Sequence, residues 1–256
     1  MYRLGASFAL EAVPMVKAVG ELPNFSFEWY SWDELIARFL EGEIDAILCP
    51  PFVAVDLPGT IVIPGVGISS KRKIPSPLLY VRGSVEEVVE LGVREKYSYW
   101  KKWLDVVMAS FGVRSIKVSI VENGRDFEGN AIIDGAEETY YLSNGYNVVN
   151  IGDLWKRVAP ELPLVCWVWV CRRGPDQKQI RMLLGRVWEK ARSNLFECVW
   201  KKGMGTEFSD FEGYPTESLE DVYYQVASAE IDSIRWFLEQ AKKFELMDKD
   251  ADFVLC

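Results

Sequence analysis

The sequence contains no histidine among its 256 residues. Histidine is the side chain that most often acts as a general base near neutral pH, and it is a frequent metal ligand. Its absence excludes Ser-His and Cys-His activation of a nucleophile, and it excludes histidine metal sites. Acid–base chemistry in this chain must therefore use Glu, Asp, Lys, Tyr or Cys.

Cysteine is scarce and irregularly spaced. The five cysteines are an odd number spread over a long chain, which argues against a disulfide framework: Cys49, Cys166, Cys171, Cys198 and Cys256. No pair has the two-residue gap of a zinc or thioredoxin motif. Cys166 and Cys171 fall in one apolar strand at odd spacing, so we expect core thiols on opposite faces. We predict no metal, no cofactor and a cytoplasmic location.

Long apolar runs and excess positive charge are also missing. No run is long enough to cross a bilayer, and no charged head precedes an apolar segment at the N-terminus, so we expect neither a membrane span nor secretion. The net charge is −9 and the pI about 4.8, which leaves no broad positive field for nucleic acid or an anionic membrane. An anionic ligand would need a local site.

Strands alternate with helices through the first part of the chain. We expect strands at 3–8, 25–31 and 43–48, a helix at 14–19, and an amphipathic helix from Trp32 that ends at Gly42. This alternation predicts a parallel sheet, and ligands of such sheets bind at the carboxyl ends of the strands.

The stretch 50–77 holds six of the twelve prolines and predicts a turn-rich approach to a second lobe around a strand at 60–63. Beyond it we expect strands at 77–82, 116–121, 130–133 and 146–151, a helix around Val85, Val88 and Val89, and a helix at 97–111. The apolar strand 164–171 returns the chain to the first lobe, and helices at 179–194 and 228–244 pack there.

The predicted fold class is therefore α/β with two lobes. The first comprises residues 1–77 plus 170–256 and the second residues 78–169, with two crossing strands as the hinge. We expect a monomer or homodimer.

Two segments are candidates for binding an anion. The run 69–76 places three cations and three hydroxyls at the predicted lobe junction, including Ser69, Ser70, Arg72 and Ser76. The alternative is a solvated basic loop. The stretch Tyr97, Ser98 and Tyr99 opens a helix whose N–H groups and hydroxyls could bind a carboxylate or phosphate, or whose rings could simply pack.

Glu11 is the candidate for acid–base chemistry. It lies just past the first strand and before a helix, at the position where α/β proteins bind ligands. A desolvated carboxyl there could act as a general base with a raised pKa. The alternative is an acid in the first turn that the helix dipole stabilises.

Several blocks together resemble the chorismate dehydratases of the futalosine route to menaquinone, which are relatives of the type II periplasmic binding proteins. Residues 10–14 resemble that family's Leu-Asn-x-x-Pro turn, and 40–48 its Leu-x-x-Gly-x-x-Asp-hydrophobic block. Residues 70–79 resemble its Ser-x-Gly-x-Val-x-Ser segment. The remaining blocks are 132–135, 150–155 and 162–172. Their order and spacing extend over nearly the whole chain.

The resemblance implies a lyase that binds a small anionic carboxylate between two lobes and removes water from chorismate. It implies Glu11 as the base, Ser76 with Ser70 and Arg72 on the carboxylate, and Asp134 in the Ile-Gly-Asp block. The chain departs from the pattern at Glu11, which replaces an asparagine. It also departs at 50–51, where prolines replace a serine pair, and at 97–100. The alternative is a cytoplasmic binding protein or sensor without catalysis.

Overall fold

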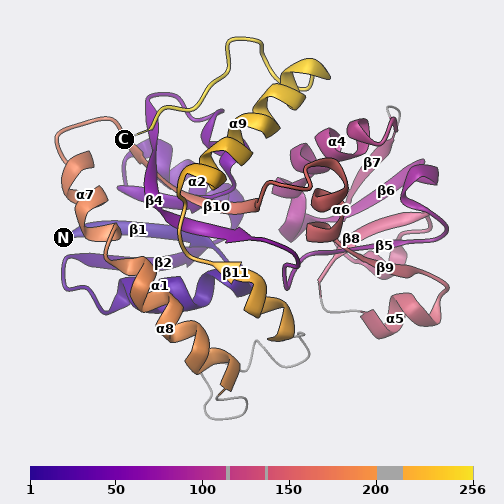
Figure 1. Ribbon diagram of the computed structural model, residues 1–256, viewed down its shortest axis with the longest axis horizontal. Coiled ribbons are helices and arrows are strands. Elements are labelled where there is room, and N and C mark those ends of the chain that lie inside the picture. The colour runs from indigo at the N-terminus through magenta and orange to yellow at the C-terminus, as the bar shows by residue number, and fades with distance from the viewer. Residues whose placement is uncertain (114–115, 136–137, 201–215, 256) are drawn as a thin grey trace.

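The computed structural model describes residues 1–113, 116–135, 138–200 and 216–255, which form two α/β lobes side by side (Figure 1). The first lobe contains a six-stranded sheet in the order β11-β4-β10-β3-β1-β2, and the second a five-stranded sheet in the order β7-β6-β8-β5-β9. Two sheets joined by β4 and β10 bear out the predicted two-lobed fold class. The predicted boundary at 169/170 falls inside β10, whose partners all belong to the first sheet.

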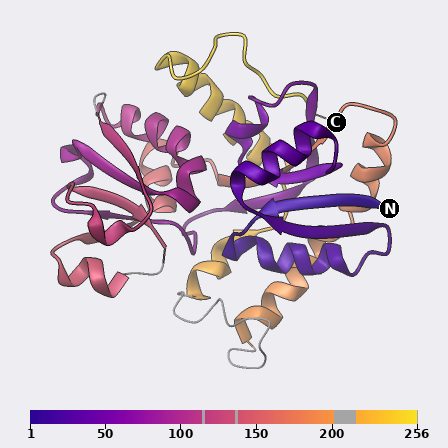
Figure 2. The ribbon, with the colours of Figure 1, turned by 180° about the vertical axis from the view of Figure 1, so that it is seen from behind.

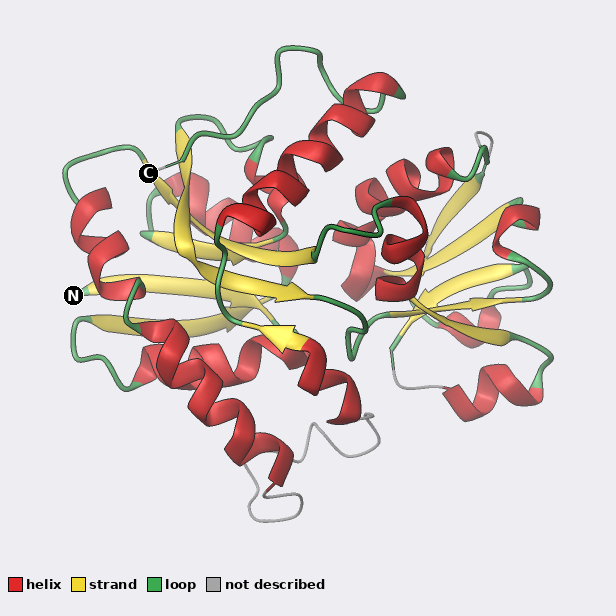
Figure 3. Ribbon diagram, viewed as in Figure 1, coloured by secondary structure: helices red, strands yellow, loops and turns green. Residues whose placement is uncertain are grey.

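The first lobe holds both ends of the described chain, as Figure 2 shows from behind. Its strands are β1 (Tyr2–Ser7), β2 (Phe25–Tyr30), β3 (Ala46–Cys49), β4 (Thr60–Ser70), β10 (Leu164–Arg172) and β11 (Val222–Tyr223). Its helices are η1 (Leu10–Ala12), α1 (Val13–Gly20), α2 (Trp32–Glu41), α3 (Pro51–Ala54), α7 (Gln177–Leu184), α8 (Val187–Trp200), η6 (Thr216–Asp221) and α9 (Ser228–Lys243). Figure 3 shows α1 and α8 on one side of the sheet and α9 on the other.

The second lobe is smaller. Its strands are β5 (Leu78–Val81), β6 (Glu90–Arg94), β7 (Lys117–Val121), β8 (Ala131–Asp134) and β9 (Asn147–Asn150). Its helices are η2 (Val85–Glu87), η3 (Glu95–Trp100), α4 (Lys101–Ser110), η4 (Gly124–Asp126), α5 (Glu138–Ser143) and α6 (Ile151–Val158).

The first sheet is parallel only in part. β1 pairs in parallel with β2 and β3, as the alternating pattern predicts. β10 runs antiparallel to β3 and β4, because it enters the sheet on the way back from the second lobe. Its first eight residues are all buried, which matches their unbroken apolar run, and Cys166 and Cys171 are among them. Cys198 and Cys256 lie outside the residues whose side chains the structure describes.

β4 is longer than the sequence predicts. The strand expected at 60–63 continues through Pro64 to Ser70. A register shift makes this possible: Ile63 pairs with Trp169 and Gly67 with Val168, so the residues between them bulge out of the ladder. Proline lacks an N–H, and in the bulge that loss breaks no ladder bond.

Three helix predictions need correction. The expected helix at 85–89 is a single turn, η2, and is followed by β6, which the sequence pattern missed. The helix expected at 97–111 is divided into η3 and α4, and the one at 179–194 into α7 and α8 on either side of Gly185. The end of α2 is confirmed, since Gly42 has a left-handed φ of 85° that glycine adopts without steric cost.

Aromatic side chains join the lobes beside the hinge. The ring centres of Trp155 in α6 and Trp236 in α9 are 5.2 Å apart, and those of Phe52 in α3 and Trp100 in η3 are 6.5 Å apart. These rings place the second lobe against the first. No helix in the described ranges combines the length and hydropathy needed to span a membrane.

Candidate functional site

A pocket of about 490 Å³ lies between the lobes, where β1 and β2 end. It is the position at which parallel strands present their carboxyl ends to a ligand. The first lobe contributes Ser7, Phe8, Ala9, Glu11, Tyr30, Ser31, Trp32 and Asp33, and the other wall consists of Ser76, Glu95, Lys96, Tyr97, Ser98 and Tyr99.

Glu11 is a buried acid in the wall of this pocket. η1 holds it directly after β1, and its side chain is 1% exposed. Oε1 accepts a hydrogen bond of 2.7 Å from the indole Nε1 of Trp167 in β10. Oε2 is shielded from solvent and has no hydrogen-bond partner among the described residues. The phenol of Tyr224 donates to the backbone carbonyl of Glu11 at 3.1 Å. The carboxyl group is therefore held in place with one oxygen unpaired.

Burial raises the pKa of Glu11 to about 7, although the hydrogen bond from Trp167 lowers it. Burial, and secondarily the charge of Glu11, also raises the pKa of the neighbouring Tyr99 and Cys166. Near neutral pH, Glu11 thus exists in both protonation states, which a proton-transfer group requires.

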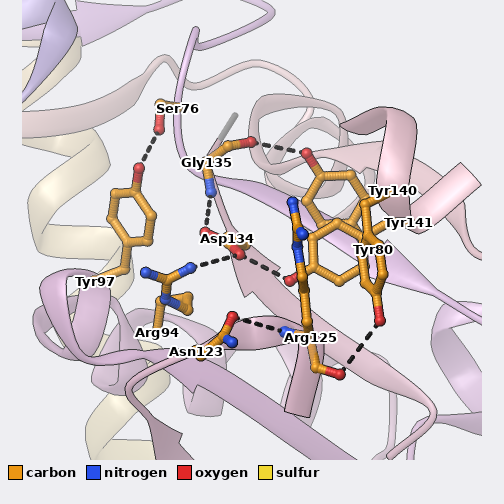
Figure 4. Close-up of polar contacts among 10 residues, drawn as sticks. All are labelled: Ser76, Tyr80, Arg94, Tyr97, Asn123, Arg125, Asp134, Gly135, Tyr140 and Tyr141. Atoms are coloured by element: carbon orange, nitrogen blue, oxygen red, sulfur yellow. Dashed lines mark hydrogen bonds and ion pairs between the residues drawn. The ribbon is translucent and has the colours of Figure 1, made fainter. Parts of the chain in front are cut away.

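The second-lobe wall is made of hydroxyls and aromatic rings. The hydroxyls of Ser76 and Tyr97 are 2.9 Å apart, and both side chains are buried (Figure 4). Ser98 is half-buried. The ring of Tyr99 lies 5.0 Å from Trp32 and 5.2 Å from Trp167, so η3 is anchored on the first lobe.

The basic run 69–76 contributes only Ser76 to the pocket. Ser70 donates to the carbonyl of Lys73 at 2.6 Å and accepts from the backbone N–H of Arg72 at 3.2 Å. Ser69 donates to Glu230 of α9 at 3.4 Å, and Arg72 is exposed. The extension of β4 through Ser70 explains this placement, because it turns these serines into strand and turn residues.

Asp134 lies inside the second lobe, outside the residues that line the pocket (Figure 4). Its carboxylate pairs with Arg94 at 3.2 Å and accepts hydrogen bonds of 2.7 Å from both the Tyr141 hydroxyl and the Gly135 N–H. These contacts occupy both of its oxygens. The structure thus brings together Glu11, Ser76, Tyr97, Ser98 and Tyr99, and it places Ser69, Ser70, Arg72 and Asp134 elsewhere.

Most of the first-lobe wall was not predicted from the sequence pattern. Tyr30 ends β2, and Ser31, Trp32 and Asp33 follow it, as Glu11 follows β1. The rule that points to Glu11, that ligands bind where parallel strands end, would have found them too if applied to β2.

No protein-family model and no curated protein matches this sequence. Solved structures do match over almost the full length. Protein AF1704 from Archaeoglobus fulgidus has a TM-score of 0.68 at 14% identity, covering 96% of this chain and 98% of its own. The alkanesulfonate-binding protein SsuA from Xanthomonas axonopodis pv. citri, bound to MOPS, has a TM-score of 0.66 at 13% identity, covering 97% and 94%.

A Candida albicans protein described as having the generic periplasmic binding protein structural fold also matches. Its TM-score is 0.64 at 12% identity, and the alignment covers 98% of this chain and 92% of that one. This chain has the periplasmic-binding-protein fold. Glu11 lies in the wall of the pocket between its two lobes.

Proposed function

We propose that this protein is a cytoplasmic carbon–oxygen lyase of the chorismate-dehydratase type that binds a small carboxylate between its lobes and needs no cofactor. One observation carries the proposal: the Glu11 carboxyl group lies in the pocket wall with Oε2 unpaired and a pKa near 7. In a chain without histidine, this group is suited to remove a proton from a carbon acid at neutral pH.

The elimination would use the Glu11 carboxylate as the base. Oε2 is shielded from solvent in this structure, so the step requires the side chain or the lobes to shift and expose it to the pocket. The carboxylate then takes the ring proton next to the enolpyruvyl ether, and the C–H electron pair forms the new double bond. The C–O bond to the neighbouring hydroxyl breaks, and the hydroxyl leaves as water after taking up a proton. The Ser76 and Tyr97 hydroxyls line the same pocket and are available as donors to the leaving group. The product is an aromatic enolpyruvyl benzoate.

Incubation of the purified protein with chorismate tests the proposal, with ultraviolet spectra and chromatography against a blank without enzyme. We expect the enolpyruvyl benzoate to form with the native chain, and Glu11→Gln to reduce kcat at least about 100-fold, the usual contribution of a general base. Glutamine keeps an acceptor for Trp167 but cannot take the proton.

Glu122→Gln is the matched control, since Glu122 is exposed and lies outside the pocket lining. It should leave kcat unchanged. Turnover by Glu11→Gln at the native rate would remove Glu11 from the mechanism.

A second function, ligand binding without catalysis, is favoured by a different observation. Glu11 is the only buried carboxyl or amino group among the described pocket residues, since Asp33, Glu95 and Lys96 are exposed. A sensor or binding protein would give no product in this assay. It would still show a raised melting temperature with ligand, because a ligand that binds the native state stabilises it.

A further inference from the structure

The charges in the pocket are unusual for a site that binds a multiply charged anion. Among the described lining residues, Glu11, Asp33 and Glu95 are acids, and Lys96 is the one cation. The Lys96 ammonium lies 4.9 Å from the centre of the Tyr97 ring, at the second-lobe wall. The described residues that line the pocket include no arginine, so none of them offers a bidentate guanidinium contact to a carboxylate. One carboxylate can lie near Lys96, but a second would face acids.

The uncharged part of the wall consists largely of aromatic rings. Phe8 is 45% exposed at the pocket and lies 5.4 Å from Trp29. Trp32 and Tyr99 face each other across the lobes with ring centres 5.0 Å apart. Tyr30 and Tyr97 complete this set. Such rings favour a flat unsaturated ligand, because offset and edge-to-face contacts add to apolar burial.

Hydroxyl groups supply the neutral donors. Ser7 ends β1 and is 8% exposed, and Ser31 precedes α2 without capping it through its side chain. Ser98 lies in the opposite wall. Hydroxyls can bind one carboxylate, or the hydroxyl of a ring, without adding charge.

We propose that the ligand of this pocket is a flat, unsaturated ring that carries one carboxylate rather than two. The inference rests on the proposed function, since it names the substrate class of the same site. Repulsion from Glu11, Asp33 or Glu95 would weaken the binding of a ligand whose second carboxylate lies within about 6 Å of them, on the order of tenfold or more. Chorismate, which has two carboxylates, would then be turned over with a high KM.

Isothermal titration of the full chain at pH 8 tests this with three probes. Benzoate and isophthalate share a ring and differ by one carboxylate, and cyclohexanecarboxylate has the charge of benzoate without the flat ring. We expect benzoate to bind most tightly. Isophthalate should bind at least about tenfold more weakly, and cyclohexanecarboxylate about threefold more weakly.

Two variants assign these differences to the pocket. The double variant Asp33→Asn, Glu95→Gln removes two acidic side chains from the pocket lining, so the affinities for benzoate and isophthalate should become more similar. Phe8→Ala should make the affinities for benzoate and cyclohexanecarboxylate more similar. Phe8 is partly exposed, so its loss should leave the fold intact. Glu122→Gln should change neither difference in affinity.

Isophthalate binding as tightly as benzoate would overturn the inference, and so would the absence of benzoate binding. A low KM for chorismate would overturn it as well, while supporting the lyase. Benzoate binding as expected, by a protein that forms no product from chorismate, would leave this inference standing and refute the lyase activity.

Discussion

Among the described residues, each lobe buries one carboxylic acid near the end of a strand, and the two acids differ in how their oxygens are paired. Glu11 in the first lobe and Asp134 in the second are both 1% exposed. Asp134 accepts from Tyr141 and Gly135 and pairs with Arg94, so both oxygens have partners. The Glu11 carboxyl group accepts a hydrogen bond from Trp167 through Oε1, and its Oε2 has no partner in the described structure.

The difference separates a structural carboxylate from a candidate functional one. A buried carboxylate that has a cation and several donors is compensated, and removing one partner destabilises the fold because the other is left without compensation. A buried carboxyl with an unpaired oxygen costs free energy in the folded protein, and such costs are concentrated at sites that bind or react. The environments of these two acids therefore say more about their roles than their burial does.

Of the substitutions that test this difference, Asp134→Ala should have the largest effect on stability. Asp134→Ala leaves Arg94 without its partner in the lobe interior, where its side chain is 20% exposed. We expect the free energy of unfolding to fall by about 3–5 kcal/mol, measured by urea denaturation. Glu122→Gln, at an exposed site, should change it by less than about 0.5 kcal/mol. A loss at Asp134 as small as the control would show that the pairing contributes little.

The pH dependence of the free energy of unfolding should show the raised pKa of Glu11. Its pKa is about 7 in the folded chain against an ordinary 4.5, so the folded state holds this proton across that window while the unfolded state releases it. The contribution is fully present below pH 4.5 and is lost as the pH rises to about 7. The total is about 3 kcal/mol, at 1.36 kcal/mol per pH unit.

Glutamine at position 11 cannot titrate. Glu11→Gln should therefore match the native chain in free energy of unfolding at pH 4 and exceed it above pH 7, by up to about 3 kcal/mol. Urea denaturation at a series of pH values measures the difference between the two proteins. A difference independent of pH would contradict the raised pKa.

The smallest effect concerns the donor to Glu11. Trp167→Phe removes the N–H that lowers the pKa of Glu11, so this pKa should rise further. The lost hydrogen bond should cost about 1 kcal/mol. Infrared difference spectra against Glu11→Gln report the protonated carboxyl directly and locate its midpoint.

Trp169→Phe is the matched variant for this measurement. Trp169 is equally buried in β10, but its indole donates to the sulfur of Met15 instead. It should leave the midpoint of Glu11 unchanged. Equal midpoints in the two tryptophan variants would mean that Trp167 only fills space.

The sequence alone predicts features that depend on residues close together along the chain. The alternation of strands and helices, the end of α2 at Gly42 and the buried run of β10 are all local patterns, and the structure bears them out. Glu11 is predictable for the same reason, because its place after β1 is a matter of chain order. The pattern fails where local signals compete. Pro64 indicates the end of a strand, yet β4 continues through it, and the apolar spacing of a helix at 85–89 obscures the start of β6.

Only the tertiary structure decides which polar side chains share a pocket. Ser70 and Ser76 lie six residues apart, yet the first closes a turn and the second faces Tyr97. The family resemblance implies Asp134 as a ligand contact, whereas in the structure it is paired with Arg94 inside its lobe. Trp167 is 156 residues from Glu11, and their contact forms because β10 crosses back between the lobes. Pairing and burial depend on such distant contacts, and they determine the charge and pKa of a side chain.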